Sequence, residues 1–262
     1  MFNSVNASST PAPALSRGLA ILELLAESRR GLTLSEIARR LSLAKSSTYQ
    51  LLKCLENRRY VHCSAKTGRY LFGLKLLHLS RMALRLLKWQ EGTSLLLRAL
   101  MDETQLTVHL GLLEDDEAIL IEKLEPRVAS RVATWLGRRM ELHCTAVGKV
   151  LMAYLPEEFL DRLIAQHGLP RHNDNTIASA RKLKEHLKQV RALGYALDDE
   201  EDEVGFRCVA APILDDRGAV AAAVSVVGTA EEITAPRLPS LVEKVKATAA
   251  AISEVLRGNP PE

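Results

Sequence analysis

Residues 33–56 read TLSEIARRLSLAKSSTYQLLKCLE, and this stretch decides the fold of the first part of the chain. Thr33 and Glu36 have the capping-box spacing that begins a helix, and a second helix is predicted from about Ala44, after an interruption at Ser42-Leu43. The apolar face of that second helix consists of Thr48, Leu51, Leu52 and Leu55. Its opposite face carries hydrogen-bonding side chains. Two short helices with a tight turn and a polar outer face indicate a helix-turn-helix.

The flanking sequence extends this motif into a larger domain. A helix with a leucine-rich face is predicted from about Leu15, and two β-prone pieces, residues 60–62 and 69–72, follow with a turn around Lys66-Thr67-Gly68 between them. Three helices followed by a basic hairpin predict a winged helix-turn-helix. An ordinary solvated helix and hairpin tip would carry the same polar residues, so the assignment to DNA contact depends on the whole arrangement.

Charge is distributed unevenly along the chain. Residues 1–75 contain 12 Lys+Arg and 4 Asp+Glu, a net charge of +8, whereas the remaining residues contain 23 and 28, a net charge of −5. A basic segment joined to a mildly acidic one indicates a module that binds polyanions and a second module with another kind of partner. Charge alone does not distinguish nucleic acid from an acidic protein.

Length and composition indicate a folded protein of one large or two ordinary domains, because 262 residues include 47% hydrophobic and 26% charged side chains. No stretch approaches the roughly 20 apolar residues of a membrane span. The first 14 residues lack the basic start and apolar run of a secretion signal, so we expect a disordered lead. The cysteines form no CxxC pair, which favours a reducing cytoplasm; they are Cys54, Cys63, Cys144 and Cys208.

The rest of the chain alternates between strand and helix patterns. A helix over residues 73–89 is apolar around more than one stripe, so we expect it to pack against its copy in a dimer or against the chain's own second domain. Strands are predicted at 106–113, 118–124, 131–136, 195–197, 207–214 and 220–227, and helices at 146–154, from 156, at 179–193 and at 238–256. This order indicates an α+β domain with a largely antiparallel sheet. The expected organisation is a DNA-binding domain at 15–73, a linker helix at 74–90 and a second domain at 91–258.

The segment HCTAVG, residues 143–148, leads from a strand into a helix through small residues. Free backbone N–H groups at such a helix start can hold a carboxylate. His143 and Cys144 could form a thiol–imidazole pair or bind zinc. However, no further ligand follows at metal spacing, and adjacent residues on a strand point to opposite faces. We therefore expect Cys144 to be a core residue and predict no metal site. The acidic run 198–203 is more often a solvated loop.

Three motifs resemble the IclR family of bacterial transcription regulators, in matching order from about Leu15 to Leu256. They are SRGLAILELLAE with LTLSEIARRLSLAKSSTYQLLKCLE and KTGRYLFG, then LHCTAVGKVLMAYLPEE, then GYALDDEEDEVGFRCVAAPILD with AVSVVG. The resemblance implies an N-terminal winged helix-turn-helix, a linker helix and a C-terminal GAF/profilin-like α/β effector-binding domain. It also implies homodimers or homotetramers that bind double-stranded operator DNA. Separately, we predict no membrane partner and no cofactor.

Candidate DNA contacts follow from the helix-turn-helix and its wing. Ser46, Tyr49 and Gln50 are expected to reach base edges in the major groove, where a glutamine amide pairs most naturally with adenine. The expected phosphate contacts and further candidates are Lys45, Ser47, Lys53, Arg17, Lys66 and Arg69, the last two at the wing tip.

Candidate effector contacts come from the resemblance. It places a small organic acid against Ala146, Val147, Asp198, Cys208 and Ser225, with an apolar wall formed by Ala129 and Val132. Some relatives have a second serine where this chain has Val227, so we expect a larger or more apolar effector. Read from sequence alone, the small residues on apolar strands would serve equally well as core filler.

The predicted function is therefore that of a sequence-specific transcription regulator, most simply a repressor, whose operator binding is controlled by a small organic acid. One alternative is an enzyme acting on a small carboxylate with Cys144 or Cys208 as nucleophile, which lacks an assembled base. Another is a DNA-binding module whose second domain binds protein and no ligand. We predict that the chain is not an enzyme.

Overall fold

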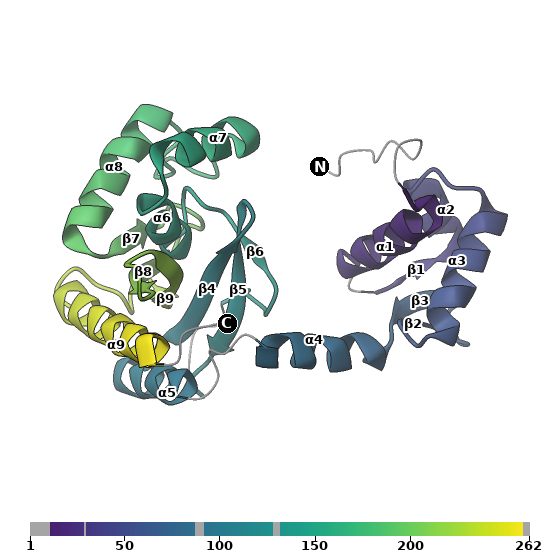
Figure 1. The fold of residues 1–262 in the computed structure, drawn as a ribbon, viewed down its shortest axis with the longest axis horizontal. Helices are drawn as coiled ribbons and strands as arrows, with labels where there is room; N and C mark the ends of the chain where they lie inside the picture. The colour runs from purple at the N-terminus through teal and green to yellow at the C-terminus, as the bar shows by residue number, and fades with distance from the viewer. Residues whose placement is uncertain (1–10, 29, 87–91, 128–131, 259–262) are drawn as a thin grey trace. The chain divides into compact units, whose positions relative to one another are not determined.

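The computed structural model describes residues 11–28, 30–86, 92–127 and 132–258, shown as coloured ribbon in Figure 1. The chain divides into two compact units, residues up to 87 and residues from 88. The expected disordered lead lies mostly outside the described residues. No helix in the described ranges combines the length and the apolar character that crossing a membrane requires.

The first unit contains a three-helix core and a small sheet. Its elements are α1 (Pro13–Ala26), β1 (Leu32–Thr33), α2 (Leu34–Arg40), α3 (Lys45–Asn57), β2 (Val61–Cys63), β3 (Arg69–Phe72) and α4 (Leu74–Leu86). The strands form an antiparallel sheet in the order β1-β3-β2. The predicted winged helix-turn-helix is confirmed. The short strand β1, which no local pattern predicted, joins the wing to the start of α2.

The capping box and the apolar face of α3 fix the helix-turn-helix. The Thr33 N–H donates to Glu36 Oε2 at 2.7 Å, and the Glu36 N–H donates to Thr33 Oγ1 at 3.3 Å. Ser42 turns the chain with φ 53°. On α3, Thr48 and Leu52 are fully buried, and Leu52 packs in a core with residues of α1, α2 and the sheet. The polar face of α3 is consequently left free.

The second unit is built around a six-stranded antiparallel sheet in the order β6-β5-β4-β9-β8-β7. Its strands are β4 (Thr107–Glu114), β5 (Glu117–Leu124), β6 (Arg139–Met140), β7 (Ala196–Asp199), β8 (Phe206–Leu214) and β9 (Val220–Thr229). Its helices are α5 (Thr93–Thr104), α6 (Ala146–Ala153), α7 (Glu157–His167), α8 (Ala180–Leu193) and α9 (Leu238–Gly258). The predicted α+β class is confirmed, and α5 is a helix that the sequence analysis missed.

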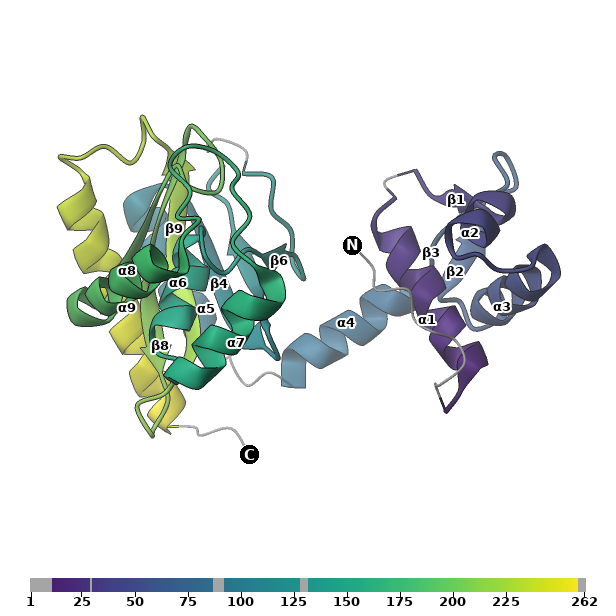
Figure 2. The same cartoon turned by 90° about the horizontal axis from the view of Figure 1, so that it is seen from above.

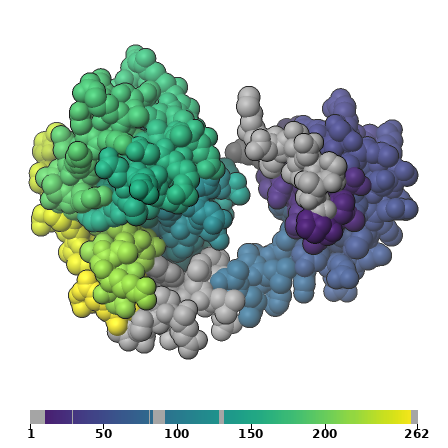
Figure 3. All heavy atoms as spheres, turned by 45° about the horizontal axis from the view of Figure 1, so that its top comes forward, coloured from purple at the N-terminus to yellow at the C-terminus, as the bar shows by residue number. Residues whose placement is uncertain are grey.

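Helices cover both faces of this sheet, as Figures 1 and 2 show. Helices α5 and α9 lie side by side on one face, over Val209, Ile213 and Val224. Helices α6, α7 and α8 pack over the other face, against Ala210 and Ala223. In Figure 3 the green atoms of α7 and α8 form a continuous outer surface of this unit. Every residue of α6 is buried, so α6 is the layer between the sheet and α8.

The strand predicted over residues 131–136 is wrong. Arg131 lies outside the described residues, residues 132–135 form no strand, and the edge strand is β6, at Arg139–Met140. The physical reason is a side chain: Lys123 Nζ donates to the carbonyls of Val132 and Thr134 at 3.0 and 2.9 Å. Those carbonyls are satisfied by an ammonium group, and the segment runs as a loop over the sheet.

Replacement of Leu52 tests whether the buried face of α3 holds the first unit together. Leu52→Ala should lower the free energy of unfolding of this unit by about 2–5 kcal/mol, because it leaves a cavity under α3. Gln50→Ala, on the exposed face of the same helix, should change it by less than about 0.5 kcal/mol. Hydrogen-exchange mass spectrometry of peptides from residues 13–72 in the full chain measures both. Equal effects would contradict this assignment of the two faces.

Candidate functional site

The exposed face of α3 gathers the predicted base-reading side chains. Ser46 and Gln50 are exposed, Tyr49 is 53% exposed, and Lys45 and Lys53 are exposed beside them. Ser47 is half-buried. Lys53 Nζ donates to Glu56 Oε2 at 3.0 Å, so part of its charge is balanced within the helix. One helix face thus presents hydroxyl, phenol and amide groups flanked by two lysines.

Arg69 is not at the wing tip. It is the first residue of β3, opposite Thr33 of β1. Its Nη1 donates to the Gly31 carbonyl at 2.8 Å and to Glu36 Oε2 at 3.1 Å. Hydrogen bonds from the backbone N–H and the hydroxyl of Thr33, and then the charge of Arg69, hold the pKa of the Glu36 carboxyl below its usual range. Arg69 therefore ties the wing to the capping box of α2.

The other predicted cations of the first unit differ in exposure. Lys66 is exposed in the turn between β2 and β3, where a phosphate could reach it. Arg17 is half-buried on α1, and it sits in the second turn of that helix because α1 begins at Pro13. Lys66 is consequently the wing residue best placed for contact with a polyanion.

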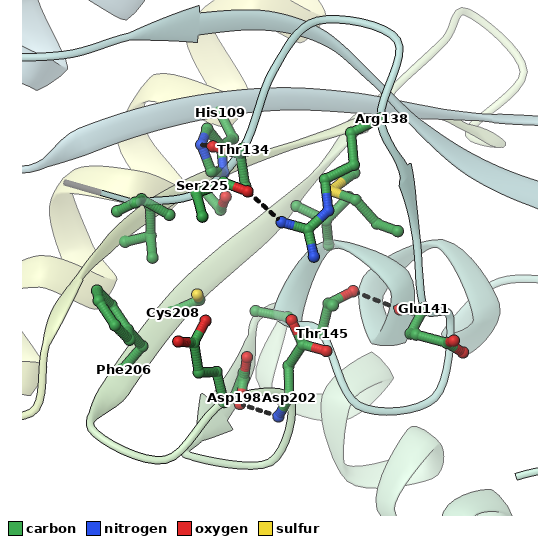
Figure 4. Close-up of a pocket in the computed structure, with 17 residues that line it drawn as sticks. His109, Thr134, Arg138, Glu141, Thr145, Asp198, Asp202, Phe206, Cys208 and Ser225 are labelled. Carbon is green, nitrogen blue, oxygen red and sulfur yellow. Dashed lines mark hydrogen bonds between the residues drawn. The ribbon is translucent and has the colours of Figure 1, made fainter. Parts of the chain in front are cut away.

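The second unit contains a cavity whose floor is formed by side chains in two adjacent rows of four neighbouring strands, shown in Figure 4. His109 of β4 pairs with Ser225 of β9, and Asp198 of β7 pairs with Cys208 of β8, which pairs with Val227 of β9. Strand alternation places these residues on the α6 face, opposite Val209 and Val226. Small and polar residues at these positions leave open space beneath α6.

The start of α6 forms one wall of this cavity. Thr145 caps the helix: its Oγ1 accepts the Gly148 N–H at 3.0 Å and donates to the Glu141 carbonyl at 2.6 Å. Ala146 and Val147 follow and line the cavity. A Cβ on Gly148 would stand 2.5 Å from the Leu142 Cα, so only glycine lets the helix approach this closely.

The loop from Val132 to Arg138 forms the opposite wall. Thr134 Oγ1 lies 2.9 Å from His109 Nε2, and Arg138 Nη1 donates to the Ala133 carbonyl at 2.6 Å. The Arg138 guanidinium also stacks over the Trp135 ring, 5.4 Å from its centroid. With the Lys123 contacts described above, these bonds fold the loop over the cavity.

The cavity is small, and its polar groups differ in charge from one side to the other. Its volume is about 60 Å³, which corresponds to about four to six waters or a ligand of similar size. Among the described residues that line it, Arg138 is the cation, and the carboxyl groups are Glu141, Asp198, Asp202 and Glu203. Figure 4 shows Arg138 on one side and Asp198 and Asp202 on the other. The expectation of a larger or more apolar effector stays a prediction.

Burial determines the protonation of two groups in the cavity. It lowers the pKa of His109 to about 3, with help from Lys123 and Arg138, so the imidazole is neutral. It raises the pKa of Asp198 to about 7, although the Glu201 N–H donates to Asp198 Oδ1 at 2.8 Å and opposes the shift. Near neutral pH, Asp198 is consequently present in both protonation states, and its protonated form can donate a hydrogen bond.

A buried ion pair supports the cavity from behind. Lys149, on the second turn of α6, is fully buried, and its Nζ donates to the Glu201 carboxylate and the Leu197 carbonyl. Leu197 and Glu201 flank Asp198, and the N–H groups of Glu201 and Asp202 donate to Asp198 Oδ1. The pair therefore connects α6 to the segment that supplies two of the carboxyl groups.

All the effector residues expected from the resemblance line this one cavity except Ala129, which lies outside the described residues. Sequence reasoning missed His109, Thr134, Arg138, Asp202 and Phe206. His109 could have been found from the sequence, because it is a polar residue between apolar neighbours in the middle part of its strand. Thr134 and Arg138 gave no such signal, because their loop was read as a strand.

Comparison with known proteins agrees with both units. Residues 14–63 match the IclR helix-turn-helix domain, and residues 82–254 match the family described as bacterial transcriptional regulator IclR C-terminal. The chain is 33% identical over 243 residues to the Escherichia coli HTH-type transcriptional regulator XynR, covering 93% of this chain and 96% of that protein. It is 35% identical over 245 residues to the E. coli HTH-type transcriptional repressor AllR, with 94% and 90% covered. The crystal structure of Thermotoga maritima IclR superposes with a TM-score of 0.77 at 31% identity, covering 93% and 98%.

Removal of the Lys149 charge tests the role of the buried pair. Lys149→Met should lower the free energy of unfolding of the second unit by about 3–5 kcal/mol, because it leaves the Glu201 carboxylate buried without its cation. Adding Glu201→Leu should recover most of that loss. Arg181→Met, which breaks an exposed pair on α8, should cost less than about 0.5 kcal/mol. Urea unfolding followed by tryptophan fluorescence measures this unit, since Trp89 and Trp135 both follow residue 87. If Lys149→Met alone were as stable as the wild type, the buried pair would not be needed for the stability of this unit.

Proposed function

The chain belongs to the IclR family of bacterial transcriptional regulators, and we propose that α3 reads its operator while the cavity under α6 binds the small acid that controls this reading. The observation that carries the proposal is the separation of two sites, an exposed polar helix face in one unit and a lined cavity in the other. Because a bacterial regulator of this kind acts on genomic DNA, we propose that the protein works in the cytoplasm. By analogy with the repressor AllR, we propose repression as the response.

The proposed DNA contacts divide into two roles. Ser46, Tyr49 and Gln50 read base edges in the major groove, because they project from the face of α3 opposite its buried side. Lys45, Ser47 and Lys53 hold phosphates, with Lys66 of the wing and Arg17 as further contacts. Arg69 contributes indirectly, by holding the wing in position. Its guanidinium donates hydrogen bonds to Glu36 and to the Gly31 carbonyl.

Exposed apolar side chains support a homo-oligomer. Leu15 and Leu19 of α1, and Leu74, Leu77 and Met82 of α4, are between 45% and 82% exposed. Apolar surface of this kind is stabilised when a second copy covers it. We propose a homodimer through these helices, which presents two copies of α3 to an operator with twofold symmetry.

The proposed effector is a compact organic acid that also carries a hydrogen-bond donor. The free N–H groups at the start of α6 and the Arg138 guanidinium suit a carboxylate. The Asp198 and Asp202 carboxyls would repel a second anionic group and suit a hydroxyl or amino group. A simple apolar acid would leave these carboxyls without partners, so a hydroxy or amino acid of about four to six non-hydrogen atoms fits better.

The cysteine-nucleophile alternative has no support in the chemistry of the site. Burial and neighbouring carboxylates raise the pKa of the Cys144 and Cys208 thiols well above their usual value. Both thiols are therefore protonated at neutral pH and are poor nucleophiles. The partner-binding alternative would require the cavity to stay empty of ligand, which a ligand screen tests directly.

Two substitutions on α3 separate base reading from phosphate binding. Gln50→Ala should lower the binding free energy for the preferred operator by about 1–3 kcal/mol. It should have little effect on an operator in which the base pair that Gln50 contacts has been changed. Lys53→Ala should weaken binding to every duplex and lower the slope of log affinity against log salt by about 1. Fluorescence anisotropy with DNA duplexes from the region upstream of the gene that encodes this protein measures both affinities. If the two variants lowered affinity equally on every duplex, these roles would be wrong.

The cavity proposal predicts a pH-dependent affinity for hydroxy acids. In a thermal-shift screen, a good ligand at 100 times its Kd should stabilise the protein by about 2.7 kcal/mol. Ser225→Ala should weaken that ligand by about 2–12-fold, the value of one hydrogen bond. Affinity should fall as pH rises through about 7, because Asp198 becomes an anion beside the ligand, and Asp198→Asn should flatten this fall. Asp216→Asn, on an exposed turn, is the control, and an unchanged pH profile in Asp198→Asn would reject the role of Asp198.

A further inference from the structure

We propose that His143, Cys144 and His172 form a binding site for a thiophilic transition-metal dication such as Zn²⁺, beside the cavity under α6 but separate from it. One ligand atom from each of these residues lies within 4.8 Å of the others. Two imidazoles and a thiolate are a ligand set that zinc prefers. None of the three residues lines the cavity.

The structure brings these residues together in a way that the sequence analysis excluded. Residues 142–144 form a turn, so the strand alternation that would separate His143 from Cys144 does not apply. The third residue comes from the connection between α7 and α8, 28 positions further along the chain. The rings of His143 and His172 lie 5.9 Å apart between centroids. The expectation of no ligand beyond His143 and Cys144 therefore rested on spacing in sequence, which misses His172.

The loop that carries His172 is held in place. His143 Nε2 donates to the Pro170 carbonyl at 2.9 Å, and Asn173 Nδ2 donates to the Glu200 carbonyl at 2.9 Å. Thr176 Oγ1 accepts the His172 N–H at 3.2 Å and donates to the Glu201 carbonyl at 2.7 Å. A third ligand on a fixed loop loses little conformational freedom when a metal binds.

The hydrogen bonds of His143 leave a lone pair available. Because Nε2 must donate to the Pro170 carbonyl, the neutral ring keeps its lone pair on Nδ1, which lies 3.7 Å from Glu141 Oε2. Histidines that bind metals commonly donate their other N–H to a backbone carbonyl in this way.

The charges around Cys144 also favour a cation. Its Sγ donates to Asp202 Oδ1 at 3.6 Å, and Glu141 Oε2 lies 3.7 Å from Nδ1 of the neighbouring His143. The negative charges that oppose a bare thiolate would stabilise a thiolate bound to a dication. On binding, the S–H proton leaves to solvent and a sulfur–metal bond forms. The Asp202 carboxylate is then free to approach the metal as a fourth partner.

Cobalt titration of the full chain tests the site. The protein is prepared without an affinity tag, stripped with a chelator and titrated with Co²⁺ and then Zn²⁺. We expect one equivalent of Co²⁺ per chain to produce the thiolate-to-cobalt charge-transfer absorption, which Zn²⁺ should displace. Cys144→Ser should abolish the band. His172→Ala, at an exposed position, should weaken binding by at least about tenfold.

Matched controls locate the metal within the chain. Cys54→Ser removes an exposed thiol in the first unit, and His167→Ala removes a half-exposed imidazole on α7, so both should bind as wild type does. No stoichiometric binding, or unchanged binding in His172→Ala, would overturn the proposal. So would a band that Cys208→Ser removes and Cys144→Ser does not, because the metal would then lie in the cavity. These readouts use neither DNA nor effector, so they are independent of the regulatory function proposed above.

Discussion

The buried contact between Lys149 and Glu201 is the interaction on which the architecture of the second unit depends. It holds α6 against the segment after β7, and that segment supplies Asp198 and Asp202 to the cavity. The same segment offers the carbonyls of Glu200 and Glu201 to the loop that carries His172. A buried pair of charges is a poor source of stability compared with apolar packing. Its value here is positional: it fixes the distance between a helix start and a set of carboxyl groups.

Helices and strands with a clear local sequence pattern could be predicted well from the sequence, whereas contacts between distant segments could not. Apolar positions at helical spacing predicted α3, and apolar, β-prone runs joined by a turn predicted β8 and β9 closely. The resemblance to a family supplied Asp198, Cys208 and Ser225, which local patterns could not distinguish from core filler. The loop from Val132 to Arg138 was misread because its carbonyls are satisfied by Lys123, a residue of another strand. No local propensity contains that information.

Electrostatics limits what the cavity can hold. A dominant positive potential would admit any small anion, but here Arg138 and the start of α6 face a group of carboxyls. Discrimination then comes from the groups that would be left unpaired or in repulsion, since each wrong ligand loses a hydrogen bond or gains a like charge. The raised pKa of Asp198 softens this filter near neutral pH, because the protonated carboxyl donates where the ionised one accepts. Selectivity and pH response are therefore properties of the same residue.

Asp202 connects the cavity with the His143, Cys144 and His172 cluster. Its side chain lines the cavity and also accepts a hydrogen bond from the Cys144 thiol. If a metal replaces the thiol proton, the Asp202 carboxylate loses a hydrogen bond from one side and gains a neighbouring positive charge. Either change alters the potential felt by a ligand in the cavity, and linkage requires that the ligand alter metal affinity by the same factor. A carboxylate shared by two sites is thus enough to couple them, with no change in the positions of the helices.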